Sequence, residues 1–67
     1  MNVYLLEMKM KVKGKTNEDM ARRIGVDPAT FYRKKAGKSE FTRSELQAIR
    51  AELSLSQDEL ESIFFKD

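Results

Sequence analysis

The residues from Met20 to Tyr32 constrain the fold of this chain most, because they carry the signals of two short helices joined by a tight turn. Ala21 is small enough to let two helices approach closely, and Gly25 suits a turn position with a positive φ angle. Asp27 followed by Pro28 is typical of a helix start, where a carboxylate accepts from free backbone amides and proline takes the first helical position. We therefore predict one helix that ends just before Gly25 and a second that begins at Pro28.

Three further helix starts follow from hydroxyl residues that stand three positions before an acidic residue. In a capping box the hydroxyl accepts a hydrogen bond from a free backbone amide, while the acidic side chain reaches back to the cap. The pairs with this spacing are Thr16 with Asp19, Thr42 with Glu45, and Ser56 with Glu59. Phe41, directly before the Thr42 cap, is expected to pack near Leu46 and to fix the entry of that helix.

The segment from residue 3 to residue 12 has a pattern that is compatible with either a helix or a strand. Leu5, Met8 and Val12 follow helical spacing, whereas Met8 to Lys13 also alternates between apolar and charged residues as a strand would. We favour a helix here.

The last two predicted helices each carry an apolar stripe, which allows them to close over the front of the domain. The stripes are Leu46, Ile49 and Leu53 in one helix, and Leu60, Ile63 and Phe64 in the other.

These signals predict a single all-α domain that covers residues 1–67. Its five short helices are expected at about 3–12, from 16, at 28–36 with Gly37 as the stop, from 42, and from 56. A domain of 67 residues buries little core, so an interface with a second copy is expected to contribute to its stability.

Composition excludes several classes of protein. The chain has no cysteine and no histidine, so disulfides, zinc fingers and the commonest general base are ruled out. A domain this small does not enclose a normal catalytic pocket, and its hydroxyl residues are accounted for as helix caps, so we expect no enzyme activity, cofactor, metal or small-molecule ligand. The apolar run Val3–Leu6 is far too short to span a membrane, which leads us to expect a soluble cytoplasmic protein.

Charge is distributed unevenly along the chain. Residues 1–43 contain eleven Lys and Arg against five acidic residues, a net charge of +6, whereas residues 44–67 carry a net charge of −4. A basic front suits neutralisation of phosphates, and an acidic tail is repelled by them. We expect the acidic part to face solvent or another protomer, away from any nucleic acid.

The two helices joined at Gly25 have the pattern of a helix-turn-helix, a motif that places its second helix in the major groove of DNA. From Thr16 to Gly37 the chain resembles the phage-repressor and Cro-like (XRE-type) helix-turn-helix family, whose fold is that of lambda repressor. The residues that carry this resemblance are the small Ala21, the glycine Gly25, and the apolar Met20, Ile24, Val26 and Phe31.

Two positions depart from the pattern of that family. Lys34 stands where members usually bury an apolar side chain, and we expect its methylenes to pack while its ammonium turns outward. Met10 and Lys35 stand where some members join the first helix to the recognition helix by an Arg–Glu pair. For Lys35, solvation of the helix surface and a DNA contact are both open interpretations.

The resemblance also implies which residues contact DNA. By position in the recognition helix, the residues that contact base edges are Ala29, Thr30 and Arg33, and the guanidinium of Arg33 suits a bidentate pair with guanine. The residues expected to contact the DNA backbone are Asn17, Tyr32, Lys38 and Ser39. Tyr32 has an alternative, in which its ring lies partly against the core.

Family members commonly pair two modules, which implies a homodimer on an inverted-repeat operator. The last helix provides the candidate interface, formed by Ile63, Phe64 and Phe65. Because Phe64 and Phe65 are adjacent, they face different ways on a helix, and one of them is expected to join the core. We therefore expect a sequence-specific, double-stranded DNA-binding protein that regulates transcription in a prophage or mobile element. The alternative is an adaptor or antirepressor that uses the same helical fold to bind another protein.

Overall fold

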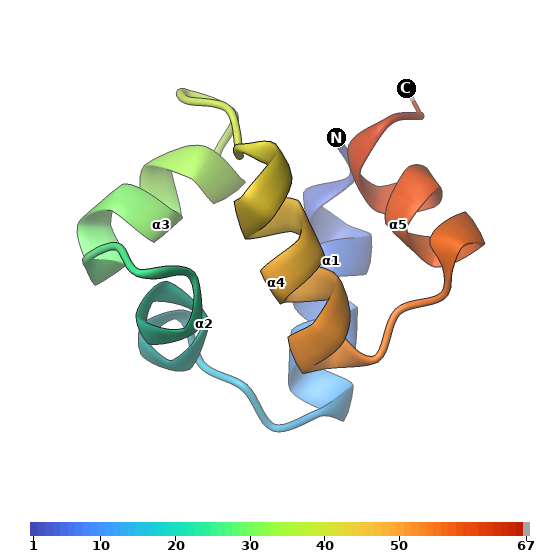
Figure 1. Ribbon diagram of the computed structural model, residues 1–67, viewed down its shortest axis with the longest axis horizontal. Helices are drawn as coiled ribbons and strands as arrows, with labels where there is room; N and C mark the ends of the chain where they lie inside the picture. Colours follow the sequence, from blue (N-terminus) through green and yellow to red (C-terminus); the bar gives the residue numbers. More distant parts are fainter. Residues whose placement is uncertain (67) are drawn as a thin grey trace.

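Each helix of this chain starts at a polar side chain bound to a free backbone amide. The computed structural model, which describes residues 1–66, contains five helices in that range (Figure 1). They are α1 (Val3–Val12), α2 (Asn17–Ile24), α3 (Pro28–Lys35), α4 (Arg43–Leu53) and α5 (Gln57–Phe64). Their caps are Asn2, Thr16, Asp27, Thr42 and Ser56, and the three predicted capping boxes are all formed. The predicted all-α fold is confirmed.

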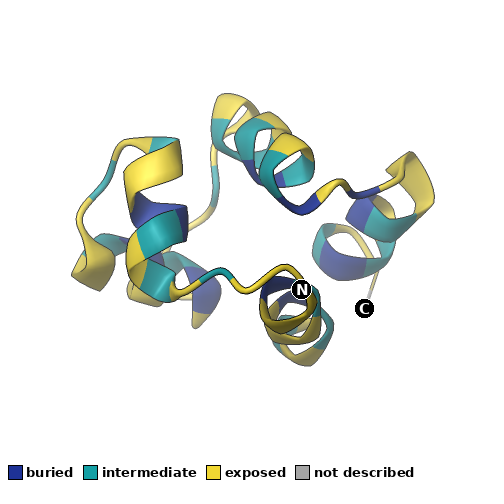
Figure 2. Cartoon of the chain, turned by 90° about the horizontal axis from the view of Figure 1, so that it is seen from below, coloured by how far each residue is buried: buried dark blue, intermediate teal, exposed yellow. Residues whose placement is uncertain are grey.

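The helices surround one apolar core. α2 packs against both α3 and α4, and α1 packs against α5. Figures 1 and 2 together show α1 and α4 on opposite sides of this core, with buried residues turned inward. The largest fully buried side chains come from all five helices and are Leu6, Met20, Phe31, Ile49, Leu53 and Ile63. The start of the chain is held to α5, because the Asn2 N–H donates to the Ile63 carbonyl over 2.6 Å.

The buried side of α1 differs from the predicted one. Residues 3–12 are helical, which excludes the strand alternative, but Leu6 and Met10 enter the core while Met8 and Val12 are 55% and 74% exposed. Of the predicted stripe only Leu5 packs partly against the core. The physical reason is that α1 carries apolar residues on both sides, so helical spacing alone does not select the side that is buried.

A row of aromatic rings fixes α3 relative to α5. Phe41, in the connection between α3 and α4, lies between Phe31 and Phe64, with ring centroids 5.9 Å and 5.5 Å away. Its ring meets that of Phe64 edge to face, a favourable geometry for two aromatic quadrupoles. Phe41 and Leu46 both line a groove at this end of α4.

Candidate nucleic-acid interface

The turn between α2 and α3 has the geometry that its residues predict. Gly25 has φ 82° and ψ 29°, and its N–H donates to the Ala21 carbonyl over 2.9 Å. The Val26 N–H donates to the same carbonyl over 3.0 Å, which closes the end of α2. Two residues later the Asp27 carboxylate accepts from the Thr30 N–H over 2.7 Å, and this bond lowers the pKa of Asp27. The helix-turn-helix is therefore formed in the predicted register.

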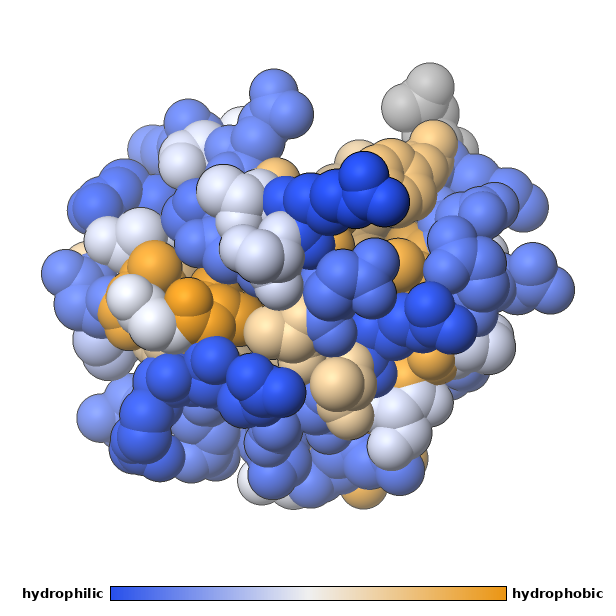
Figure 3. Space-filling model, viewed as in Figure 1, coloured by the Kyte–Doolittle hydropathy of each residue, from blue (hydrophilic) through white to orange (hydrophobic). Residues whose placement is uncertain are grey.

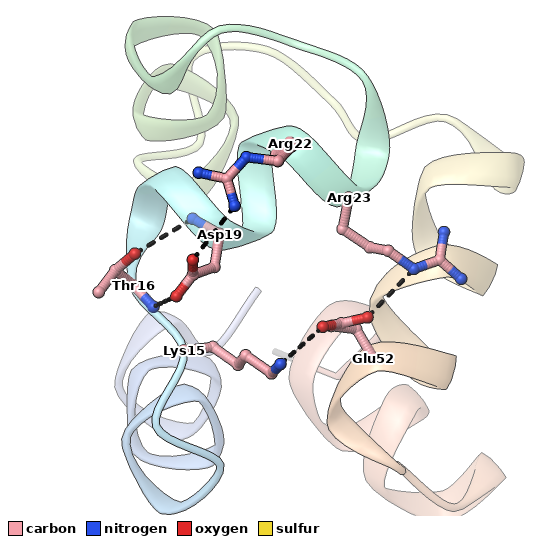
Figure 4. Close-up of polar contacts among 6 residues, drawn as sticks. All are labelled: Lys15, Thr16, Asp19, Arg22, Arg23 and Glu52. Carbon is pink, nitrogen blue, oxygen red and sulfur yellow. Dashed lines mark hydrogen bonds and ion pairs between the residues drawn. The ribbon is translucent and has the colours of Figure 1, made fainter.

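The second helix of the domain is fixed to α4 through a single carboxylate. Glu52, near the end of α4, accepts from the ammonium of Lys15, two residues before α2, at 2.8 Å and from the guanidinium of Arg23, near the end of α2, at 3.1 Å (Figure 4). The bond from Lys15, followed by the contribution of Arg23, keeps the pKa of Glu52 below its ordinary value. With α2 held in this way, its N-terminus and the start of α3 keep a fixed relative position.

The inner side of α3 is held by one aromatic and one charged residue. Phe31 is fully buried, and the Lys34 ammonium binds the Glu45 carboxylate at 3.0 Å and the Glu40 carbonyl at 2.9 Å. Burial raises the pKa of Glu45, but the Thr42 N–H and the Lys34 ammonium more than offset it, so the pKa lies below its ordinary value. The Lys34 side chain is only 11% exposed, so its charge is paired inside the domain instead of turning outward as expected.

Lys35 has a role that neither sequence interpretation anticipated. It is 7% exposed, and its ammonium binds the Asn17 side-chain oxygen at 2.8 Å and the Glu7 carboxylate at 3.1 Å. It also lies 5.9 Å from the centre of the Phe31 ring. Lys35 is therefore a buried link between α1, α2 and α3, and it contributes to neither helix solvation nor the DNA-facing surface. Glu7 lies three residues before Met10, so α1 and α3 are joined by an ion pair that the residues at positions 10 and 35 did not predict.

The outer side of α3 carries the residues predicted to contact bases. Ala29, Tyr32 and Arg33 are exposed, and Thr30 is partly buried. One Arg33 Nη donates to the Thr30 hydroxyl over 3.0 Å, so the guanidinium lies along the helix with its remaining N–H groups available to a partner. Tyr32 is 60% exposed, which decides between its two interpretations in favour of a ring directed away from the core.

Basic residues that make no ion pair lie in α3 and in the segment that follows it. Within residues 1–66, Arg33, Lys38 and Arg43 make no ion pair, and all three are exposed. Ser39 is exposed between the last two. Sequence reasoning did not select Arg43, although its position directly after the Thr42 cap, at the first residue of α4, marks it as a cation on a helix end.

The acidic part of the chain does not simply face solvent, as its charge pattern suggested. Glu45, Glu52 and Glu59 are spaced by seven residues, and each pairs with a cation from residues 1–43. Glu59 binds the Lys9 ammonium of α1 and also accepts from the Ser56 N–H, and these contacts lower its pKa to about 2. The two oppositely charged parts of the chain are thus joined through the fold, which leaves only a subset of the basic residues available to a ligand.

The end of α5 offers a smaller surface for a dimer interface than predicted. Ile63 is fully buried in the monomer core, so it is not available to a second copy and the prediction that it lines the interface is wrong. Phe64 is half-buried against Phe41, while Phe65 is 63% exposed, so the two phenylalanines do face different ways. Phe64 and Phe65 line a groove of about 300 Å³ with Phe41 and Leu46. Figure 3 shows hydrophobic atoms reaching the surface beside this end of the chain.

Comparison with protein families agrees with this geometry. A family model of the Cro/C1-type helix-turn-helix DNA-binding domain matches residues 5–65, which include α2 to α5 in full and α1 from Leu5 onward. The chain belongs to this family. As a Cro/C1-type domain it is a DNA-binding protein, and the match extends well beyond α2 and α3 to the helices that support them. Searches of curated proteins and of solved structures give no match.

No group of three or more Asp and Glu side chains within residues 1–66 is arranged to hold a metal ion. In the same range the longest helix, α4, has 11 residues, and none of the helices is long and apolar enough to cross a membrane.

Proposed function

We propose that this Cro/C1-type protein is a small transcriptional regulator that inserts α3 into the major groove and recognises a specific operator. The observation that carries this proposal is the division of α3 into two sides. Lys34 and Lys35 are held inside by carboxylates, whereas Arg33 and Tyr32 stand exposed on the outside. A rigid inner side and an accessible outer side are what recognition of base edges by a helix requires.

The base contacts belong to Ala29, Thr30 and Arg33. Arg33 supplies paired N–H donors that match the O6 and N7 acceptors of guanine, and its present bond to Thr30 holds the guanidinium close to the helix. Thr30 offers its methyl group to thymine, and Ala29 offers an apolar contact only. Three side chains at the start and middle of one short helix cover a few base pairs, which is the usual span for one such module.

The backbone contacts belong to Asn17, Tyr32, Lys38 and Ser39, and Arg43 is added to them. Asn17 is the first residue of α2, and because Lys35 donates to its side-chain oxygen, its amide nitrogen is left to donate to a phosphate at that helix end. Lys38, in the connection between α3 and α4, and Arg43, the first residue of α4, supply positive charge. These contacts position α3 without reading sequence.

Operator binding as a homodimer completes the proposal. The groove at the end of α5, with Phe64 in its wall and Phe65 exposed at its edge, is the surface assigned to a second copy. Two copies related by a two-fold axis recognise an inverted repeat, because the symmetry of the operator follows that of the protein. We place such a regulator in a prophage or mobile element, acting in the bacterial cytoplasm on chromosomal DNA.

Selection from a pool of random double-stranded DNA tests this function directly. The full chain is expected to enrich an inverted repeat, and fluorescence anisotropy on that sequence should show affinity that falls steeply with salt, with a slope of about −0.9 per neutralised phosphate. Absence of any enriched sequence would contradict specific recognition. Tight capture of a repressor or polymerase subunit, with no DNA affinity at any salt concentration, would favour the adaptor or antirepressor function instead.

A further inference from the structure

The exposed side of α1 carries a group of large apolar side chains. Among residues 1–66 six large hydrophobic residues are exposed, and three of them, Tyr4, Met8 and Val12, lie on α1. They are 82%, 55% and 74% exposed, respectively. Because they are spaced by four residues they form one stripe, opposite the side on which Leu6 and Met10 enter the core. Figure 2 shows α1 at the edge of the molecule with its outer surface exposed.

When two copies of α1 run in opposite directions, the charged residues beside this stripe face residues of opposite charge in the second copy. Glu7 and Lys11 lie four residues apart along one edge of the stripe. An antiparallel pair with Met8 on the two-fold axis places Tyr4 against Val12 of the second copy. Since helical side chains lean toward the N-terminus of their own helix, this pair also brings Lys11 beside Glu7 of the second copy.

Glu7 and Lys11 are available for such a contact. Within residues 1–66 Lys11 makes no ion pair, and it is exposed. Glu7 binds Lys35 through one carboxylate oxygen, and its side chain remains 50% exposed. The stripe and its edge are thus complementary to a second copy of the same stripe in both hydrophobicity and charge.

We propose that α1 is a self-association surface, on which a second copy of this chain packs antiparallel with Met8 against Met8. The seam is short, roughly 12 Å of helix from Tyr4 to Val12 at 1.5 Å per residue, so it buries less area than a stable dimer requires. Its contact is therefore weak in dilute solution. It lies on a different helix from the α5 groove and does not depend on DNA binding, so it joins copies beyond the operator-bound pair.

Disulfide trapping tests both the contact and its direction, because the chain has no native cysteine. Met8→Cys should cross-link with itself on mild oxidation, several-fold more than Ala51→Cys, a control at an exposed position on α4. Val12→Cys should not form a disulfide with a second copy of itself. In a mixture it should form a disulfide with Tyr4→Cys, and mass spectrometry distinguishes this mixed dimer from the dimer of Val12→Cys with itself. Equal yields from Met8→Cys and Ala51→Cys would overturn the proposal, and self-linking of Val12→Cys would overturn the antiparallel arrangement.

A charge reversal provides a second readout that needs no cysteine. Lys11→Glu places a carboxylate beside Glu7 of the second copy, so it should lower the sedimentation coefficient at high protein concentration. Lys13→Glu is the matched control, since Lys13 follows α1 on the side away from the stripe and is also exposed. Equal effects of the two reversals would mean that net charge alone governs association and that the α1 seam does not form. Affinity for a single DNA half-site, measured in parallel, reports on the proposed operator binding separately.

Discussion

Arg33 is the side chain on which base specificity is expected to depend most. Within residues 1–66 its exposed guanidinium makes one hydrogen bond, to Thr30, so Arg33→Ala should leave the unfolding temperature nearly unchanged. Loss of a bidentate contact to guanine should cost roughly 1–3 kcal/mol of operator binding and relax the preference at one base position. Selection from random DNA with the variant measures this preference, and an unchanged consensus would exclude Arg33 from the base contacts.

Lys38 provides the matched comparison, because it lies five residues further along and is also exposed. Lys38→Ala should weaken binding to every sequence alike and make the salt dependence shallower by about one phosphate. The two alanine variants therefore separate recognition of bases from neutralisation of the backbone. A loss confined to one base pair in Lys38→Ala would contradict its assignment to a phosphate.

Glu59 makes the stability of the domain sensitive to acid. The Lys9 ammonium and the Ser56 N–H lower the pKa of Glu59 from 4.5 to about 2, so the folded state favours the ionised carboxylate. This stabilisation is complete above about pH 4.5 and is lost as the pH falls through about 2. Glu59→Gln should lower the unfolding temperature at pH 7 and flatten its decline between pH 5 and pH 2.

Glu61→Gln is the control for that measurement, because Glu61 lies on the same helix and makes no ion pair within residues 1–66. Thermal unfolding followed by circular dichroism at a series of pH values compares the three proteins. If Glu61→Gln flattened the acid response as much as Glu59→Gln, the pair between α1 and α5 would not be its cause.

At the scale of the helices, Gly25 carries the turn on which the relative position of α2 and α3 depends. A Cβ at Gly25 would meet no atom within 4 Å, so the cost of a substitution lies in its φ of 82° and not in a clash. Gly25→Val should lower stability by at least about 1–2 kcal/mol, the cost of a left-handed conformation, and more because valine is β-branched. Gly25→Asn, which tolerates this conformation better, should cost less, and equal melting temperatures for the two variants would contradict the turn.

At the end of α4 a substitution is expected to stabilise the domain instead of destabilising it. Ser54 has φ 53° and ψ 45°, and it is the only residue other than glycine with a positive φ in the part of the chain that the structure describes. Ser54→Gly should therefore raise stability by about 1 kcal/mol in thermal unfolding, since glycine adopts this conformation without strain. Ser44→Gly, the same change inside α4, should lower it. A destabilising Ser54→Gly would mean that the serine contributes more to the cap than its backbone strain costs.

Helix ends were predictable from sequence, whereas helix sides were not. Thr16, Thr42 and Ser56 each form the cap that local spacing predicts, because a capping box involves residues only three positions apart. The buried side of α1 depends instead on the neighbours that it meets in space. An apolar residue such as Met8 fits either side by composition, and only packing in the folded domain decides that Met10 is buried and Met8 is not.

The same limit applies to the nucleic-acid interface across the whole molecule. Exposure of Arg33 and Lys38 follows from their places in and after the recognition helix, so sequence predicted it. Burial of Lys35 depends on Glu7, which lies 28 positions earlier, and no local pattern connects the two. Ile63 belongs to an apolar stripe that matches a core or an interface equally well, and only its packing in the folded domain places it in the core.

Phe65 tests the arrangement of the whole assembly on DNA. If two copies meet at the α5 groove, their recognition helices should enter successive major grooves about 34 Å apart. Phe65→Lys places an ammonium at the edge of that groove, where Phe65 is 63% exposed in the monomer, so folding should be unaffected. Binding to an operator with two half-sites should lose its cooperativity while affinity for one half-site is retained, as titrations of both DNAs would measure. An equal loss on both would assign Phe65 to the stability of the monomer, and a footprint that covers only one half-site would contradict the dimer.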